Sequence, residues 1–120
     1  MSARNQSNGL TTAEIERLAV LAEELGSVSR VIGRILRHGY ASTNPRCAQR
    51  HQISNRVSLQ YGLGDVLCAI SLLTDAGDLD AGRVTQGARH KAAQLRGVLQ
   101  HQSAPVMTEE ALEEAYRGAL

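Results

Sequence analysis

Hydrophobic residues recur at steps of three and four along most of the chain, which is the spacing of one face of an α-helix. We predict that a first helix begins at the segment Thr11–Glu14, which has the form of a capping box. It runs to about His38, where Gly39 is placed to end it in a left-handed conformation. Its apolar positions are Ile15, Leu18, Leu21, Ala22, Leu25, Val28, Ile32, Ile35 and Leu36.

A second helix is predicted to begin near Ser54 or Asn55 and to end at Ala76-Gly77, before an Asp-rich turn. Its apolar stripe consists of Leu59, Leu63, Val66, Leu67, Ile70 and Leu73. Residues 40–54 show no sustained periodicity and contain a proline, so we expect a long surface loop there.

A third helix is predicted from about Asp80 to Gln102, and a fourth from Thr108 to Gly118, separated from the third by Pro105. No segment has the alternation of a β-strand. The predicted fold is therefore an all-α bundle of three to four helices. We expect a flexible N-terminus over 1–10, one helical domain over 11–103 and an extra C-terminal helix within 104–120.

Two further rows of residues bear on assembly. Beside the main stripe of the first helix lies a second one, made of Val20, Glu24, Ser27 and Val31. Apolar residues then cover more than half of this helix, which favours a homo-oligomer, either a dimer or a tetramer. The second helix carries a row of small residues around one carboxylate, made of Ser58, Gly62, Asp65 and Ala69. Such a row leaves space or lets another helix approach closely.

Composition narrows the class of protein. The length of 120 residues suits a single domain, and an aromatic fraction of 2% argues against a stacking platform for single-stranded nucleic acid. The net charge of +1 and the lack of a helix-turn-helix pattern give no support for duplex DNA binding. No uninterrupted apolar run approaches about 20 residues and the start is polar, so we expect a cytoplasmic protein without a membrane partner.

Charge is unevenly distributed along the chain. Residues 25–64 contain no acid but six arginines: Arg30, Arg34, Arg37, Arg46, Arg50 and Arg56. The first three share one face of the first helix. They can form an ordinary solvated face or a binding site for phosphate, to which guanidinium groups are well suited.

Several segments resemble the all-α nucleoside triphosphate pyrophosphohydrolases of the MazG type, especially the short phage-encoded members. They are Leu21-Ala22-Glu23-Glu24, Arg34-Ile35-Leu36-Arg37-His38-Gly39, Asn55-Arg56 and Leu63-Gly64-Asp65-Val66-Leu67, and the likeness covers about residues 15–102. The resemblance implies hydrolysis of a nucleoside triphosphate to the monophosphate and pyrophosphate, with Mg²⁺ as cofactor. It implies that Glu23, Glu24 and Asp65 bind the metal and that Glu24 and Asp65 are the catalytic carboxylates. Phosphates would be bound by Arg34, Arg37, Arg56 and Lys91.

The sequence departs from this family at two of the four metal-ligand positions. Ser27 and Gly62 stand where the family has acids, so half of the ligand set is missing. This leaves three hypotheses: a pyrophosphohydrolase with low or no activity, a catalytically silent protein that binds a nucleotide or a partner, and a repurposed or engineered member that binds a small molecule. The third would use Asp65 as a general base without metal. Its pocket would be lined by Val20, Ser27, Val31, Gly62, Ala69 and Leu72.

Overall fold

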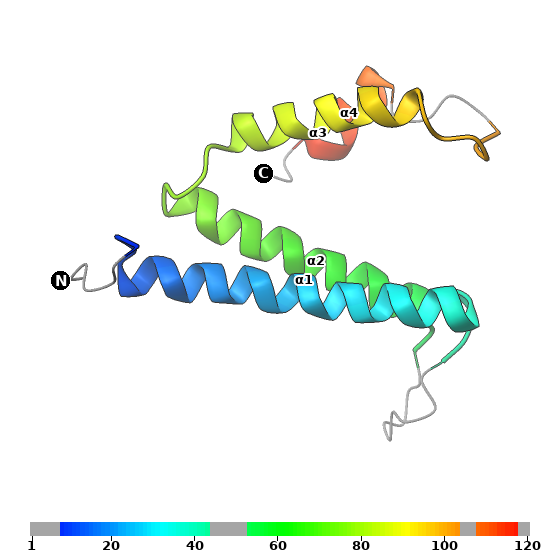
Figure 1. The fold of residues 1–120 in the computed structure, drawn as a ribbon, viewed down its shortest axis with the longest axis horizontal. Coiled ribbons are helices and arrows are strands. Elements are labelled where there is room, and N and C mark those ends of the chain that lie inside the picture. The colour runs from blue at the N-terminus through cyan, green and yellow to red at the C-terminus, as the bar shows by residue number, and fades with distance from the viewer. Residues whose placement is uncertain (1–7, 44–52, 104–107, 118–120) are drawn as a thin grey trace. The chain divides into compact units, whose positions relative to one another are not determined.

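The structure is a computed structural model that describes residues 8–43, 53–103 and 108–117. Within these ranges it contains four helices and no strand, which confirms the all-helical fold class (Figure 1). The helices are α1 (Thr12–His38), α2 (Asn55–Asp75), α3 (Ala81–Arg96) and α4 (Glu109–Tyr116). The chain divides into two compact units, residues 1–72 and 73–120, so that α3 shares a unit with α4.

The predicted capping box is present at the start of α1. The Glu14 N–H donates to Thr11 Oγ1 at 3.1 Å, and the Thr11 N–H donates to Glu14 Oε1 at 2.8 Å. The end of α1 differs in detail from the prediction. Gly39 has a positive φ of 88°, as expected, but its ψ of 168° lies outside the left-handed helical region, because the chain turns at once into an extended segment.

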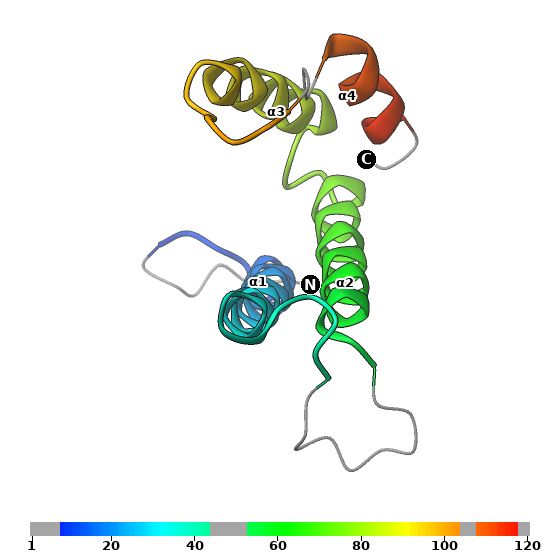
Figure 2. The same ribbon diagram turned by 90° about the vertical axis from the view of Figure 1, so that its right-hand side faces the viewer.

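In the first unit, α1 and α2 run antiparallel and side by side as a helical hairpin (Figures 1 and 2). They approach each other closely at Gly62, where a Cβ atom would lie only 3.1 Å from Cγ2 of Val28. Val28 is buried, and Ala69, two turns along from Gly62 on the same face of α2, is 1% exposed. Gly62 therefore lies on the surface of α2 against which α1 packs.

The loop that joins α1 to α2 is fixed at both ends. Thr43 and Ser54 form an isolated antiparallel bridge, and the Asn55 N–H donates to the Ser42 carbonyl oxygen at 2.8 Å. The Asn55 side chain is buried, and its Nδ2 donates to the Gly39 carbonyl oxygen at 3.1 Å. The end of α1 is thereby bonded directly to the start of α2. Residues 44–52, including Arg46 and Arg50, lie outside the described ranges.

By length and composition, α2 is apolar enough to cross a membrane. Its mean hydropathy reaches 1.4 over 18 residues, and only 11% of that window is buried. The expectation of no membrane partner rested on the absence of a long uninterrupted apolar run, and the hydropathy of α2 removes that argument. Core helices of soluble proteins meet the same criterion, and α2 is packed against α1 through Gly62.

In the second unit, α3 ends at Arg96 and not at about Gln102, as predicted. The N–H groups of Val98 and Leu99 both donate to the Leu95 carbonyl oxygen, which closes a tight turn after Gly97. Val98 is 64% exposed, so no packing favours a longer helix. α4 begins as predicted, with Thr108 Oγ1 accepting the Ala111 N–H at 3.2 Å.

We predict that Asn55→Ala lowers the free energy of unfolding by about 1–3 kcal/mol, because the buried Asn55 side chain no longer donates to the Gly39 carbonyl oxygen. Urea unfolding followed by circular dichroism measures the change. Gln60→Ala, at an exposed position of α2, is the control and is expected to stay within about 0.5 kcal/mol of the unsubstituted protein. Equal losses in the two variants would contradict the role of the Asn55 side chain.

We predict that alanine stabilises the protein at Gly64 and not at Gly62. In a helix, alanine is favoured over glycine by up to about 1 kcal/mol, and a Cβ at Gly64 meets nothing within 4 Å. At Gly62 the same gain is offset because the new Cβ presses on Val28. Thermal unfolding of the two variants provides the comparison, and equal increases in Tm would show that the hairpin is looser at Gly62 than the structure indicates.

Candidate functional site

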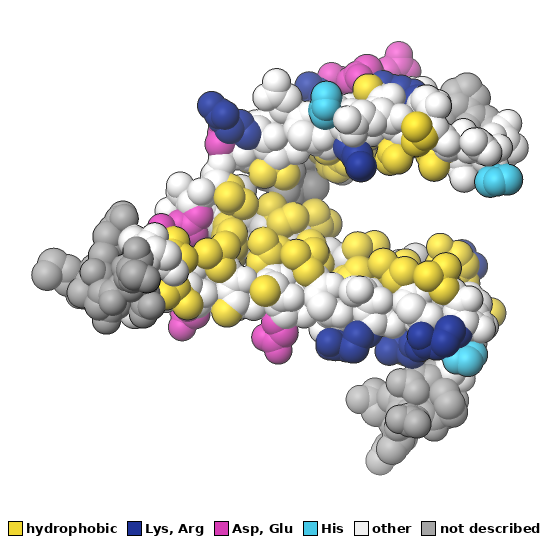
Figure 3. Space-filling model, viewed as in Figure 1, with side chains coloured by type: hydrophobic (Ala, Val, Ile, Leu, Met, Phe, Trp, Pro, Cys, Tyr) yellow, Lys and Arg dark blue, Asp and Glu magenta, His cyan; other side chains and the backbone are white. Residues whose placement is uncertain are grey.

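Charge on α1 is divided along the length of the helix. The acids Glu14, Glu16, Glu23 and Glu24 and one base, Arg17, precede Gly26, whereas only bases follow it: Arg30, Arg34, Arg37 and His38. Side chains three or four residues apart share a helix face, so the arginines gather on one side of the C-terminal half of α1. Figure 3 shows them as a blue patch along this half, with the acids towards the other end. We call Arg30, Arg34 and Arg37 the arginine cluster.

The arginine cluster surrounds an open hollow of about 440 Å³, whose other lining residues are Ser29 and Gly33. The Arg37 Nη1 lies 3.5 Å from the place that a Cβ at Gly33 would occupy. Because Gly33 has no side chain, the hollow extends down to the helix backbone. Arg30 Nη2 donates to Ser27 Oγ at 3.0 Å. The hollow is therefore lined by cationic side chains held over the bare surface of one helix.

Within the described part of the chain, no carboxylate forms an ion pair with any member of the arginine cluster. The Arg34 Nε atom is buried and has no hydrogen-bond partner. Like charges at steps of three and four on a helix repel one another, and a buried donor without an acceptor costs free energy. An anion bound in the hollow would relieve both penalties.

Arg56, predicted to bind phosphate, lies at the first turn of α2. Its Cζ stands 4.5 Å from the centroid of the Tyr40 ring, which is the geometry of a cation–π contact. Its N–H donates to the Tyr40 carbonyl oxygen at 3.0 Å, so this arginine belongs to the end of the hairpin where α1 also ends. The remaining predicted phosphate ligand, Lys91, is exposed on α3 in the other unit.

Two of the predicted metal ligands lie at the same level of the hairpin. Glu24 is half-buried one turn before Val28 on α1, and Asp65 is exposed about one turn after Gly62 on the antiparallel α2. Glu23 is exposed and, being adjacent to Glu24, projects about 100° away from it around the helix. The described ranges contain no group of three or more His, Cys, Asp or Glu side chains that could hold a metal ion. Two carboxylates hold Mg²⁺ only together with further oxygen ligands, such as waters or the phosphates of a substrate.

The residues predicted to line a small-molecule pocket differ in their surroundings. Ser27 and Val31 are half-buried and Ala69 is buried, whereas Val20 is 36% and Leu72 is 43% exposed. Val28 occupies the space beside Gly62 where a side chain would project. α1 itself therefore fills the room that this glycine leaves.

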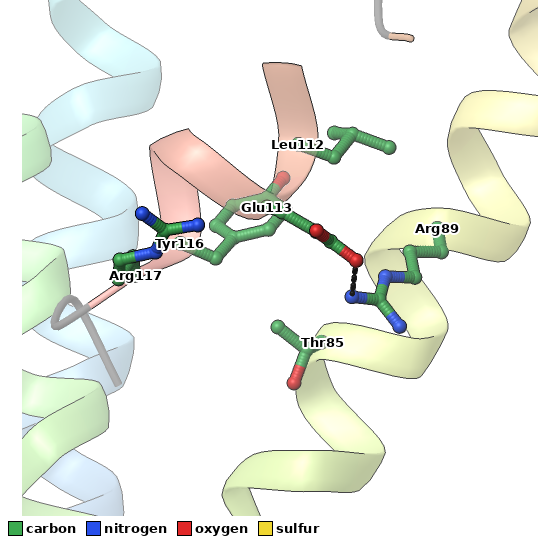
Figure 4. A pocket seen from close by; sticks show the side chains of 6 residues that line it. All are labelled: Thr85, Arg89, Leu112, Glu113, Tyr116 and Arg117. Atoms are coloured by element: carbon green, nitrogen blue, oxygen red, sulfur yellow. Dashed lines mark hydrogen bonds and ion pairs between the residues drawn. The ribbon is translucent and has the colours of Figure 1, made fainter. Parts of the chain in front are cut away.

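The second unit has a hollow of its own, of about 290 Å³, between α3 and α4 (Figure 4). Its lining residues are Thr85, Arg89, Leu112, Glu113, Tyr116 and Arg117. Arg89 points to Glu113, with Nη2 and Oε1 3.3 Å apart, and its Nε lies 3.8 Å from Glu109 Oε2. These glutamates neutralise Arg89, so the hollow attracts an anion less than the arginine cluster does. No periodic signal links its two halves in the sequence, which is why sequence reasoning missed it.

Comparison with known proteins identifies no relative. No family model matches the chain, and no similar curated protein or solved structure is found.

Proposed function

We propose that the chain binds a phosphorylated ligand, most simply a nucleotide, at the arginine cluster of α1. The observation that carries this proposal is the gathering of Arg30, Arg34 and Arg37 around one hollow without an acid paired to any of them among the described residues. Guanidinium groups bind phosphate oxygens through paired, charge-assisted hydrogen bonds. The buried Arg34 Nε has no hydrogen-bond partner, and a shift of this side chain would let it donate to such an oxygen.

A nucleotide is favoured over other phosphorylated ligands by the resemblance to MazG-type pyrophosphohydrolases. Of the four phosphate-binding positions that the resemblance implies, Arg34, Arg37 and Arg56 lie in the first unit, whereas Lys91 lies in the second. In this proposal the chain has little or no catalytic activity. Serine at position 27 and glycine at position 62 leave Glu24 and Asp65 without the two acids that would complete the family's metal site. The proposal therefore assigns these two carboxylates no catalytic step.

A second candidate is weak hydrolysis of a nucleoside triphosphate. Its support is that Glu24 and Asp65, from different helices, lie at one level of the hairpin. If the ligand's own phosphates supplied the missing oxygen ligands of a magnesium ion, these carboxylates would face it from the protein side.

We predict that the full chain binds inorganic pyrophosphate in isothermal titration calorimetry, and that Arg34→Gln and Arg37→Gln each weaken binding about tenfold or more. A hydrogen bond to a charged group contributes about 1.5–3 kcal/mol, which corresponds to at least a tenfold change in affinity. Added salt weakens binding further. Arg83→Gln is the control, because Arg83 is 87% exposed, pairs with Asp80 and lies in the other unit. Equal affinities in all four proteins, or no binding at millimolar pyrophosphate, would refute the site.

We predict that the unsubstituted chain with Mg²⁺ releases pyrophosphate from nucleoside triphosphates no faster than a blank without protein. Ser27→Glu combined with Gly62→Glu restores the family's acids and is expected to raise the rate above the blank. Since a side chain at position 62 meets Val28, circular dichroism must first show that the variant is folded. Release of pyrophosphate by the unsubstituted chain above the blank would instead support the second candidate, and a rate of about 1 s⁻¹ or faster, typical of enzymes, would show that the loss of the two acids does not impair catalysis.

A further inference from the structure

The second unit is built from two helices of opposite charge. Residues 81–107 contain no acid but four fully charged bases: Arg83, Arg89, Lys91 and Arg96. α4 carries four acids in its eight residues: Glu109, Glu110, Glu113 and Glu114. The two helices lie side by side (Figures 1 and 2), so a basic helix holds an acidic one against it.

Two arginines of α3 make the ion pairs that hold α4. Arg89 Nη2 lies 3.3 Å from Glu113 Oε1 (Figure 4), and Arg89 Nε lies 3.8 Å from Glu109 Oε2. Arg96 Nη2 lies 3.8 Å from Glu109 Oε1. Arg89 and Arg96 are two turns apart on one face of α3, and the two glutamates are one turn apart on α4. The opposite charges are therefore aligned along the two helices.

An apolar contact lies between these charges. Leu112 is 6% exposed and is the buried side chain of α4. It comes three residues after Glu109 and directly before Glu113, on the face that the ion pairs turn towards α3. Ala92 lies between Arg89 and Arg96 on the same face of α3 and is 2% exposed. A small residue of the basic helix thus leaves room for a leucine of the acidic helix.

α4 is held weakly and fits incompletely. It has eight residues, whereas isolated helices shorter than about 12–15 residues are marginal in water. Its ion pairs join exposed side chains, 47% exposed for Arg89 and 62% for Glu109, where water and salt weaken them. The hollow of about 290 Å³ between the helices stays unfilled, and Arg117 lines it together with Arg89, a like charge.

We propose that this face of α3 binds an acidic amphipathic helix of a partner protein, and that α4 occupies it in the unbound chain. The docking face consists of Thr85, Arg89, Ala92 and Arg96. The partner helix repeats the Glu-x-x-Leu-Glu pattern of α4 and is longer, because α3 extends one turn beyond Thr85, where Gly82 leaves the same face bare. It must displace α4, which competes at an effective concentration on the order of millimolar because it belongs to the same chain.

A nucleic-acid backbone is the other anionic partner that a basic helix can bind. The helix is favoured because the docking face buries a leucine between its two arginines, and a phosphate backbone has no apolar group to place there. The inference concerns the second unit alone and does not rest on the proposed function. α4 also lies beyond residues 15–102, so the MazG-type resemblance implies nothing about it.

The test is a titration of the ¹⁵N-labelled full chain with an acetylated peptide of residues 108–117, followed by the amide shifts of α3 in NMR spectra. Leu112→Ser in the full chain releases α4 without changing α3. This variant is expected to bind the peptide at least tenfold more tightly than the unsubstituted chain, whose own α4 covers the docking face. The double variant Glu109→Gln and Glu113→Gln releases α4 by a second route and is expected to behave in the same way. Circular dichroism must first show that α3 stays helical in both.

The charge requirement is tested in the Leu112→Ser chain. Adding Arg89→Gln is expected to weaken peptide binding tenfold or more, whereas Arg83→Gln is the matched control, because Arg83 is 87% exposed and pairs with Asp80. A peptide with Glu109→Gln and Glu113→Gln is expected to bind at least tenfold more weakly than the unsubstituted peptide.

Three outcomes would overturn the proposal. They are equal peptide affinities in the released and unsubstituted chains, no binding to either released chain at millimolar peptide, and equal binding of the two peptides. Binding of a short DNA duplex to the Leu112→Ser chain, without binding of the peptide, would identify a nucleic-acid surface instead.

Discussion

The contact between Val28 and Gly62 is the constraint on which the first unit depends. Helices bury little surface unless they approach closely, and here the approach is set by a glycine that presents only backbone to a valine side chain. The same contact bears on chemistry. An acid at position 62, as the MazG-type resemblance requires, would have to displace Val28 or turn aside from it. At position 62, where the resemblance would place a metal ligand, the two helices instead pack directly against each other.

Periodicity and capping residues predicted the helices well, because both depend on neighbours a few residues away. The capping box at Thr11 and Glu14 and the cap at Thr108 are local in this sense. The predicted end of α3 was wrong. The apolar pattern continues through Val98 and Leu99, but both side chains are exposed, so no packing stabilises a helix there. The pattern of apolar residues in a segment does not show whether another part of the protein packs against them.

The same limit explains what was found and missed at the functional surfaces. The arginine cluster follows from spacing alone, but the unpartnered Arg34 Nε does not, because it depends on how the long side chains fold over the helix. On α1 the sequence placed Leu25 and Leu36 in the main apolar stripe, yet in the structure they are 51% and 82% exposed. The sequence of a helix with a wide apolar face does not show which of its apolar residues are covered by the rest of the chain. For α1, the position of α2 decides which residues are covered.

The bonding at the closed end of the hairpin has a consequence for how this chain tolerates change. The Thr43–Ser54 bridge and the Asn55–Gly39 hydrogen bond fix the exits of the two helices on either side of the nine residues 44–52. The register of α1 against α2 is then set by groups outside that segment. Since doubling a loop's length costs only about 0.6 kcal/mol in closure entropy, the segment is a natural site for insertion. A short flexible peptide inserted there is expected to leave the helices of the first unit in register, because the bonds that set this register lie outside the segment.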